Sequence, residues 1–315
     1  MQKPYLVSAN FGLRNKQFHM TIGLTLIAII ATIMLLSIFS LTFAVAQTDK
    51  KQDISKLVDK GLSLVNSGNY TEGLMNIDRA LRIDSNDTVA LFGKGLAIRR
   101  ITNNDTEAMK YYDKAFEVDP TSKYGLVSRG TALSILGNST EALKYFDKAL
   151  NIDPNNKYAL SRKGYALYNS RGTALSIRGN STEALKYFDK ALNIDPNFTE
   201  ALEYKGITLI GITLNEPVNR DNLSGSTNFT KALKYFDKAL NINPNNAEAL
   251  YDKGRAYRLL AFEEPNKHTS AKSIEFLDKA LAINPKHKNA LFNKGRVVDD
   301  MDYGMIIYCI TISLI

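Results

Sequence analysis

The sequence predicts an all-α fold, a solenoid of about six helical hairpins plus a partial seventh, preceded by one transmembrane or signal helix. Three observations predict it. Prolines recur at separations of 34, 42, 48 and 41 residues, at Pro120, Pro154, Pro196, Pro244 and Pro285. Apolar and small residues repeat between them at the spacing of one helix face. A long uncharged segment precedes the first of these units.

The composition is that of a folded protein without disulfides. The chain has 315 residues, of which 44% are hydrophobic and 23% charged, and its single cysteine is Cys309. These values exclude a disulfide scaffold and a disordered chain. The net charge is +8, but Lys3, Arg14 and Lys16 of the leader contribute part of it. The remaining charges of both signs are interspersed, so we expect no nucleic-acid partner.

The N-terminal region reads as a basic leader, residues 1–20, followed by an uncharged segment, residues 21–46. This segment exceeds the roughly 20 residues that a bilayer-spanning helix needs. Its length favours an uncleaved anchor in the membrane through residues 21–43, whereas the ending Ala44-Val45-Ala46 favours a signal peptide cleaved after Ala46. The first alternative predicts a single-pass membrane protein with its repeats outside the cytoplasm, and the second a secreted protein. Lysines on both sides leave the topology open.

Residues 123–156 show the repeat in its simplest form. Gly137 and Asn138 are typical of a helix end followed by a helix start, and Pro154 ends the second helix. Each helix carries one stripe at i, i+4 and i+7: Leu126, Gly130 and Leu133 in the first, Ala142, Phe146 and Ala149 in the second. The unit is therefore a helical hairpin with small residues where its helices cross.

The same frame recurs over residues 54–302, after a linker at residues 47–53. We place the units near 54–87, 88–122, 123–156, 157–198, 199–246 and 247–287, with a partial seventh at 288–302 that begins with Leu291, Gly295 and Val298. Residues 303–315 form an atypical apolar tail. This tail is either the remnant of a disrupted repeat or a segment that binds a partner, and its role stays open.

Three units are longer than the others, and residues 128–155 and 170–197 differ only at Leu136 and Arg178. In the fourth unit, the extra residues either lengthen the first helix or follow a break at Asn169-Ser170. The insertions at residues 215–229 and 263–270 are rich in Pro, Asn and Ser, which predicts loops between the paired helices.

The recurring residues resemble the tetratricopeptide repeat. The family pattern places a large residue, Leu-Gly, Ala, Phe, Ala and Pro at fixed offsets, although leucine replaces its favoured tryptophan and Ser85 its first proline. The resemblance implies a superhelix of helix pairs whose concave groove binds peptides or assembles complexes. Its groove positions imply these binding residues: Phe92, Arg99, Tyr124, Tyr158, Tyr165, Tyr168, Tyr251, Arg255, Arg258, Phe292 and Arg296.

Tyrosines in the middle of that set and arginines toward its C-terminal end suit an extended peptide with an acidic portion. The family's carboxylate clamp is not matched, because Val58, Leu62 and Val127 occupy places that need polar residues. The chain lacks catalytic and phosphate-binding motifs, and its histidines have no metal-site spacing. We therefore expect no enzymatic activity, no cofactor, no metal and no small-molecule substrate.

The resulting hypothesis is a non-enzymatic scaffold at the cell envelope that binds a protein or peptide partner in its groove. The alternative is an accessory or regulatory subunit of a membrane-bound enzyme or of a secretion or assembly machine. Eight N-x-S/T sequences are candidate glycosylation sites if the repeats are exported: Asn69, Asn86, Asn104, Asn138, Asn180, Asn197, Asn222 and Asn228. The partner's identity and the oligomeric state stay open.

Overall fold

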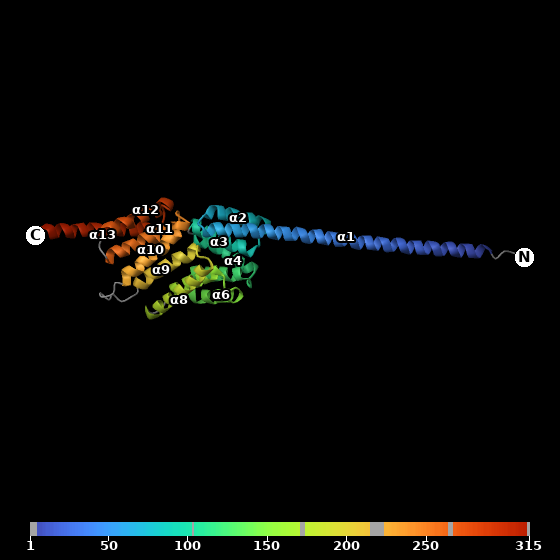
Figure 1. Cartoon of the computed structure of the whole chain (residues 1–315), viewed down its shortest axis with the longest axis horizontal. Helices are drawn as coiled ribbons and strands as arrows, with labels where there is room; N and C mark the ends of the chain where they lie inside the picture. The colour runs from blue at the N-terminus through green and yellow to red at the C-terminus, as the bar shows by residue number, and fades with distance from the viewer. Residues whose placement is uncertain (1–4, 103, 171–173, 215–223, 264–266, 314–315) are drawn as a thin grey trace. The chain divides into compact units, whose positions relative to one another are not determined.

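The computed structural model describes residues 5–102, 104–170, 174–214, 224–263 and 267–313, and the regular elements in these ranges are all α-helices (Figure 1). The chain divides into two compact units, residues 1–56 and residues 57–315. The first helix, α1, runs from Tyr5 to Asn66 and belongs to both. Residues 47–53, expected as a linker, are thus helical.

The first unit consists of the apolar part of α1. Within the described residues, one helical stretch is long and apolar enough to cross a membrane; it lies in Ile29–Asn66 and reaches a mean hydropathy of 2.4. The large apolar side chains described between Ile29 and Val45 are exposed. Hydroxyl groups in and just after this stretch, such as those of Ser37 and Thr42, donate to backbone carbonyls one turn earlier at 2.7–2.9 Å. They therefore need no water, as an apolar environment requires.

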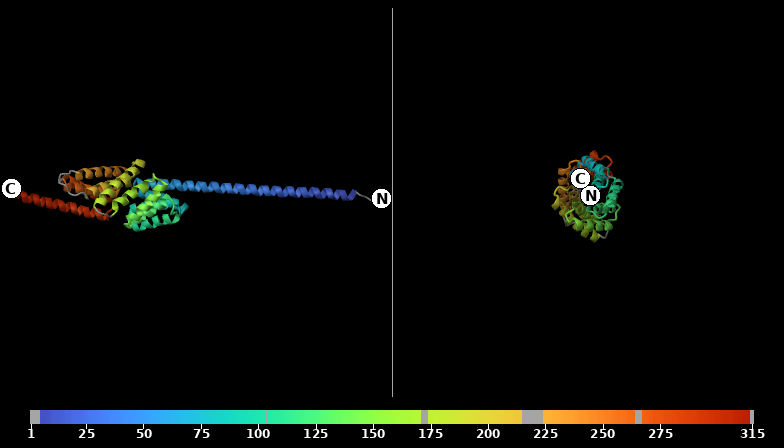
Figure 2. Two further views of the ribbon diagram at one scale, coloured as in Figure 1. Left: turned by 90° about the horizontal axis from the view of Figure 1, so that it is seen from below. Right: turned by 90° about the vertical axis from the view of Figure 1, so that its right-hand side faces the viewer.

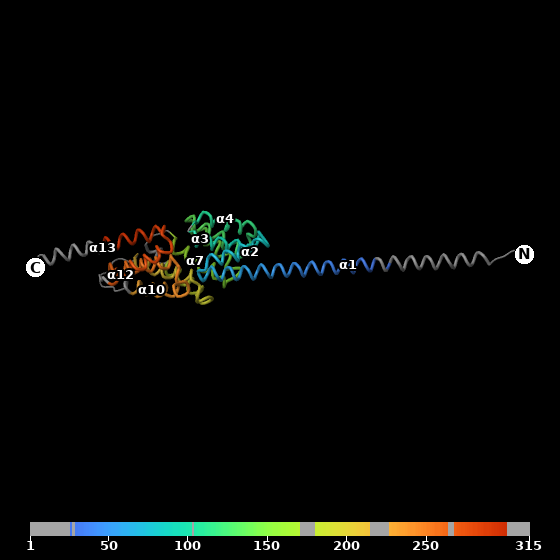
Figure 3. Tube along the Cα trace, turned by 90° about the horizontal axis from the view of Figure 1, so that it is seen from above, coloured from blue at the N-terminus to red at the C-terminus, as the bar shows by residue number. Residues whose placement is uncertain are grey.

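The second unit contains the end of α1 and twelve further helices. Their bounds are α2 Tyr70–Ile83, α3 Thr88–Thr102, α4 Asp105–Val118, α5 Lys123–Ile135, α6 Ser139–Ile152, α7 Lys157–Asn169, α8 Ala174–Ile194, α9 Thr199–Leu214, α10 Ser224–Ile242, α11 Ala247–Glu263, α12 Lys267–Ile283 and α13 Lys288–Ser313. Helices consecutive in the chain pack together as hairpins (Figure 3).

The odd-numbered helices form an inner row. Each of α3, α5, α7, α9 and α11 also contacts the next odd-numbered helix. The even-numbered helices form the outer row, and the hairpins of this unit follow one another around an axis in the end-on view (Figure 2). The predicted repeat architecture, six hairpins and a seventh inner helix, is present.

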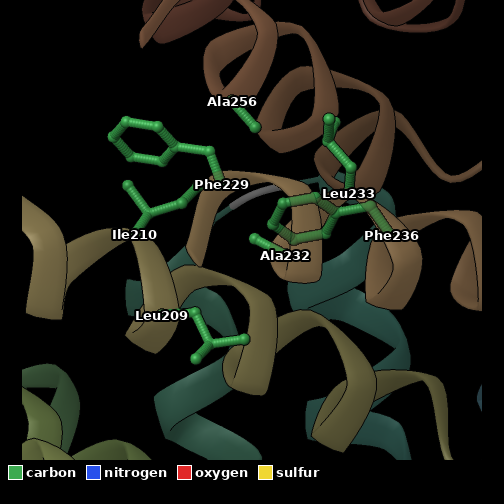
Figure 4. Packing of buried hydrophobic residues seen from close by; sticks show 7 residues of the cluster. All are labelled: Leu209, Ile210, Phe229, Ala232, Leu233, Phe236 and Ala256. Carbon is green, nitrogen blue, oxygen red and sulfur yellow. The ribbon is translucent and has the colours of Figure 1, made fainter. Parts of the chain in front are cut away.

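Glycines on the inner helices explain how closely each hairpin packs. A Cβ atom added at Gly130 would lie 2.6 Å from the ring of Phe146, and one at Gly206 would lie 2.6 Å from the ring of Phe236. Only glycine leaves room for these rings. One layer of the resulting core joins three helices (Figure 4): Leu209 and Ile210 of α9, Phe229, Ala232, Leu233 and Phe236 of α10, and Ala256 of α11.

A ladder of ion pairs joins each hairpin to the next. A lysine or arginine beside each inner glycine pairs with an aspartate of the preceding outer helix: Lys94–Asp78, Arg129–Asp113, Lys163–Asp147, Lys205–Asp189, Lys253–Asp237 and Lys294–Asp278. Because these pairs are partly exposed, each contributes little stability, but together they favour one register between neighbouring units.

The turns follow the chemistry that the sequence indicates. Asn138 caps α6 by accepting a hydrogen bond from the backbone N–H of Glu141 at 3.2 Å, and Asn69 and Asn104 cap α2 and α4 in the same way. Gly68 and Gly137 have φ of 85° and 79°, which other residues rarely adopt.

In the longer units, the added residues lengthen the second helix of the hairpin. In the fourth, α7 ends at Asn169 and the extra residues lengthen the second helix, α8, so the break at Asn169-Ser170 is the correct alternative. Residues 224–229 and 267–270 are helical rather than looped, because they extend α10 and α12 at their starts. Residues 215–223 and 264–266 lie outside the described residues. The tail, as far as residue 313, continues α13.

Candidate functional site

The predicted groove residues all lie on the inner row, but they differ in accessibility from one end to the other. In the second to fourth units, Phe92 and Tyr158 are buried and Arg99, Tyr124, Tyr165 and Tyr168 are half-buried. In the sixth and seventh units, Tyr251, Arg255 and Arg258 are half-buried, and Phe292 and Arg296 are exposed.

Phe92 and Tyr158 belong to the core and offer no surface to a ligand, which corrects their assignment as binding residues. Their ring centroids are 5.2 Å apart, and Tyr158 in turn packs edge-on against Phe198 at 5.3 Å. Burial raises the pKa of Tyr158 well above its usual value. Tyr124 lies at the edge of this cluster, 5.6 Å from Phe92.

The cause of this burial is contact across the axis of the superhelix. The Asn66 amide, at the end of α1, donates to the hydroxyl of Tyr158 on α7 at 2.7 Å. The hydroxyl of Thr199, at the start of α9, donates to the backbone carbonyl of Asn66 at 2.7 Å. The first hairpin therefore packs against the fourth and fifth units and fills the N-terminal half of the groove.

Ion pairs strengthen this closure. The guanidinium of Arg100 on α3 lies 2.9 Å from the carboxylate of Glu203 on α9, and Asn246 donates to the same carboxylate at 2.5 Å. Arg162 pairs with Glu200 at 2.9 Å, and both side chains are buried. A buried charge is costly without its partner, so these ion pairs favour the closed arrangement over others in which the partners are separated.

A cavity of about 140 Å³ remains beside the cluster. It brings together two predicted binding residues, Arg99 and Tyr165, with the ends of three inner helices. Its lining is Arg99, Asp105, Thr131, Ser134, Ile135, Phe146, Arg162, Tyr165 and Asn169. Arg99 pairs with Asp105 at 2.8 Å, and Tyr165 stacks on Tyr204 at 4.3 Å, where burial raises the pKa of Tyr204 to about 12. The cavity is large enough for a few water molecules.

The C-terminal half of the row is open and basic. The Nε of Arg258 donates to the Asn293 side chain at 3.1 Å, and its Nη1 lies 3.9 Å from Asp300. Desolvation lowers the pKa of Arg258, and the charges of Arg296 and Arg255 lower it further, whereas Asp300 raises it. Arg258 is thus repelled by two other arginines and attracted by Asp300. An anionic group placed there relieves the repulsion.

His287 and Glu248 lie beside this surface. His287 caps α13 by accepting the N–H of Ala290 at Nδ1, so its Nε2 faces Glu248, 3.3 Å away. Burial raises the pKa of Glu248, but the hydrogen bond from His287 outweighs it, and the pKa is lowered. The cap was recognisable, because Asn156 and Asn246 occupy the same place before α7 and α11.

Five of the candidate glycosylation sites lie at repeat turns, whereas Asn180 and Asn228 lie within α8 and α10. Asn69, Asn86, Asn104, Asn138 and Asn197 are exposed, whereas Asn180 and Asn228 are partly covered. Asn180 donates to Ser170 at 2.7 Å. Asn222 lies outside the described residues. Over the side chains that the structure places, no three His, Cys, Asp or Glu residues gather in a way that suits a metal ion.

Models of the tetratricopeptide repeat family match four stretches of the sequence, residues 124–156, 159–198, 223–246 and 235–273. No curated protein matches the chain. Solved structures that resemble it include YrrB, described as a tetratricopeptide repeat protein with an unusual peptide-binding site. YrrB is 24% identical, with 70% of this chain and 97% of YrrB covered and a TM-score of 0.39.

Two further solved structures match the chain. Pseudomonas aeruginosa PilF is 16% identical over 79% of this chain and 99% of its own, with a TM-score of 0.40. A monomeric mutant of IFIT1 is 16% identical over 78% of this chain and 58% of its own, with a TM-score of 0.54. At these identities the likeness concerns the helical-repeat fold alone.

Proposed function

We propose that this chain, a tetratricopeptide repeat protein with an apolar N-terminal helix, is a non-enzymatic scaffold at the cell envelope. Its partner is a protein or peptide that binds the open, basic half of the inner helix row, formed by Tyr251, Arg255, Arg258, Phe292 and Arg296. We call this surface the basic face.

One observation carries the proposal: accessibility of the inner row rises toward the C-terminal end. Phe92 and Phe292 hold the same place in their units, yet the first is 0% exposed and the second 65%. The N-terminal half is filled by the chain itself, so within the described residues the exposed inner-row side chains that an extended ligand can reach lie in the sixth and seventh units.

The chemistry of the basic face indicates the ligand. Arginine guanidinium groups form two parallel hydrogen bonds with a carboxylate, and an exposed phenylalanine supplies apolar contact area. Tyr251 packs against His287 at 4.8 Å and gives the face a rigid floor. A segment with acidic residues beside an apolar side chain fits this combination.

The envelope location rests on the sequence and form of α1. A stretch of α1 exposes apolar side chains all round and satisfies its own hydroxyl groups, as a bilayer-spanning helix does. An uncleaved helix makes a single-pass protein with the repeats outside the cytoplasm, and cleavage after Ala46 makes a secreted one. Mass spectrometry of the mature N-terminus distinguishes them, since a secreted form starts at Gln47. Complete protection of the repeats from protease in intact cells would contradict both.

The binding proposal is tested by selecting peptides from a random library with the full chain in nanodiscs. We expect enrichment of acidic peptides that contain an apolar or aromatic residue. A variant with Arg255→Gln, Arg258→Gln and Arg296→Gln should bind them at least about tenfold more weakly, the effect of losing one charge-assisted contact.

The matched control removes the same charge elsewhere. Lys110, Lys186 and Lys234 are exposed on the outer helices α4, α8 and α10, and their replacement by glutamine should leave binding unchanged. Equal loss in both triple variants would mean that net charge alone attracts the peptides. Undiminished binding to the arginine variant would refute the basic face as the site.

A further inference from the structure

The last inner helix, α13, lacks the packing that the other inner helices share. Each earlier inner glycine faces one large side chain of the following helix, so that an added Cβ would lie 2.5–2.8 Å from it. The pairs are Gly61 with Ile77, Gly95 with Tyr112, Gly130 with Phe146, Gly164 with Phe188, Gly206 with Phe236 and Gly254 with Leu277. A Cβ added at Gly295 would meet nothing within 4 Å.

The residues around Gly295 are exposed in the same way. Leu291 and Val298 flank it one turn before and one turn after, and they are 51% and 42% exposed. At the same places in the second to fifth units, the residues are at most 8% exposed: Leu91 and Ile98, Leu126 and Leu133, Leu160 and Leu167, Leu202 and Leu209. We call Leu291, Gly295 and Val298 the open stripe of α13.

Lys294 shows which side chain is missing beside the stripe. In four earlier units the equivalent lysine lies between an aspartate and an aromatic ring of the following helix, 3.9–4.8 Å from the ring centroid: Lys94 and Tyr111, Lys163 and Tyr187, Lys205 and Tyr235, Lys253 and Phe276. Lys294 has its aspartate, Asp278, at 2.7 Å, but its side chain is 40% exposed, against 11–22% for those four.

From this geometry we propose that the open stripe is a docking site for an amphipathic helix of a partner protein, which completes the seventh hairpin. The helix carries a small residue, an aromatic residue three positions later, a large apolar residue next to it, and a second small residue three positions beyond. Ala142, Tyr145, Phe146 and Ala149 of α6 show this pattern, and Ala184, Tyr187, Phe188 and Ala191 of α8 repeat it.

The same interface, formed six times within the chain, supports this occupant. The large apolar residue fills the space above Gly295, the small residues let the helices approach, and the aromatic ring covers Lys294. A second copy of the chain is a poorer fit. Its helices α4, α6, α8, α10 and α12 are already packed on their own inner helices.

The open stripe and the basic face are different surfaces of α13. Phe292 and Arg296 follow Leu291 and Gly295 by one residue each, so they point about 100° away around the helix. The docking helix is therefore additional to the ligand of the basic face. Either surface can be removed without the other, and failure of one proposal leaves the other intact.

The test uses a fluorescent peptide of the α6 sequence, residues 139–152, as the probe helix, added to the full chain in nanodiscs. We expect saturable binding of one peptide per chain by fluorescence anisotropy. The same peptide with Phe146→Ala should bind at least about tenfold more weakly, because the glycine stays unfilled.

Substitution on the chain locates the site. Gly295→Leu occupies the space with its own side chain and should weaken binding by at least about tenfold. It should leave the fold unchanged, because nothing lies within 4 Å of its Cβ. Arg296→Ala, on the neighbouring surface, should leave binding of the probe unchanged.

Three results would overturn the proposal. The first is the absence of saturable binding, or binding that Gly295→Leu does not weaken. The second is a dimer, seen by light scattering, that Gly295→Leu dissociates, because a second copy then covers the stripe. The third is binding only after deletion of residues 303–315, which would mean that the chain's own tail occupies the stripe.

Discussion

Arg100 and Glu203 are separated by 103 residues in the chain, and their side chains meet at 2.9 Å across the axis of the superhelix. The contact joins α3 to α9 and closes the N-terminal half of the groove. Glu203 is buried, and its other carboxylate oxygen accepts a hydrogen bond from Asn246, the residue that caps α11. This one carboxylate therefore links α3, α9 and the start of α11.

Replacing Arg100 by alanine should destabilise the protein strongly, because Glu203 then keeps a buried charge without its cation. The expected loss in the free energy of unfolding is about 3 kcal/mol, measured by urea denaturation of the full chain in nanodiscs. Arg129→Ala, which breaks a half-exposed pair with Asp113, is the control and should cost about 1 kcal/mol or less. Equal losses would show that the cross-axis pair has no special role.

The sequence predicts local features well, because each depends on residues within one unit. The spacing of Leu126, Gly130 and Leu133 defines an inner helix, and Gly130 indicates where Phe146 crosses it. Asn138 and Gly137 mark a turn by their own chemistry. The contact between an inner glycine and a large side chain repeats in every complete unit, so six approximate copies reinforce one another.

Closure of the groove was not predictable in this way. Closure depends on the curvature that accumulates over several units. The spacing of residues within one unit does not indicate that Arg100 meets Glu203. In the family pattern, Phe92 and Tyr158 stand at positions that line the groove, and Arg100 does not. In this structure Phe92 and Tyr158 are buried in the core, and Arg100 makes the contact across the axis. The break before α8 was left open for a similar reason, because its duplicated residues fit two helix starts equally well.

The inner glycines should respond to substitution according to whether a side chain of a neighbouring helix lies against them. Gly206→Leu places a side chain 2.6 Å from the ring of Phe236 and should lower the free energy of unfolding by about 1–3 kcal/mol or more. Gly295→Leu has open space, and because leucine favours a helix more than glycine does, it should raise the free energy of unfolding by up to about 1 kcal/mol. Thermal denaturation of both variants measures the difference. A matching loss at Gly295 would mean that its surroundings are already filled.

The stability of the sixth unit should depend on pH through Asp252. Burial raises the pKa of this carboxyl well above its usual value, Arg255 lowers it, and Glu248 and Glu203 raise it. A raised pKa means that the folded state holds the proton more tightly than the unfolded chain. The contribution of Asp252 to stability is therefore complete below the unfolded pKa of 3.8 and is lost as the pH rises through the folded value.

Asp252→Asn should then increase the free energy of unfolding at neutral pH and have a diminishing effect as the pH falls toward 3.8. Urea denaturation of both proteins across this range measures the difference. Glu248→Gln is the opposite case, because His287 lowers the pKa of Glu248. That substitution should destabilise the protein at neutral pH and lose its effect in acid. If the difference in the free energy of unfolding between wild type and Asp252→Asn did not change with pH, Asp252 would not carry a buried charge at neutral pH.

Phe92 and Phe292 provide a matched pair that separates stability from binding. Both are the fifth residue of their inner helix, and their exposed fractions are 0% and 65%. Phe92→Ala should reduce the free energy of unfolding by about 3–5 kcal/mol, because it leaves a cavity between α3, α5 and α7. Phe292→Ala should leave stability within about 0.5 kcal/mol and weaken binding of the acidic peptides selected on the basic face by about 2 kcal/mol.

Urea denaturation and peptide titration of both variants measure the two effects. Phe292→Leu keeps most of the apolar contact and should retain most of the affinity, whereas a purely structural role would show no such rescue. If Phe292→Ala destabilises the protein as much as Phe92→Ala, then α13 packs more tightly than its exposure indicates. If Phe292→Ala changes neither stability nor peptide binding, the ligand contacts the inner row elsewhere than at Phe292. The arginines of the basic face then bind it without an apolar anchor.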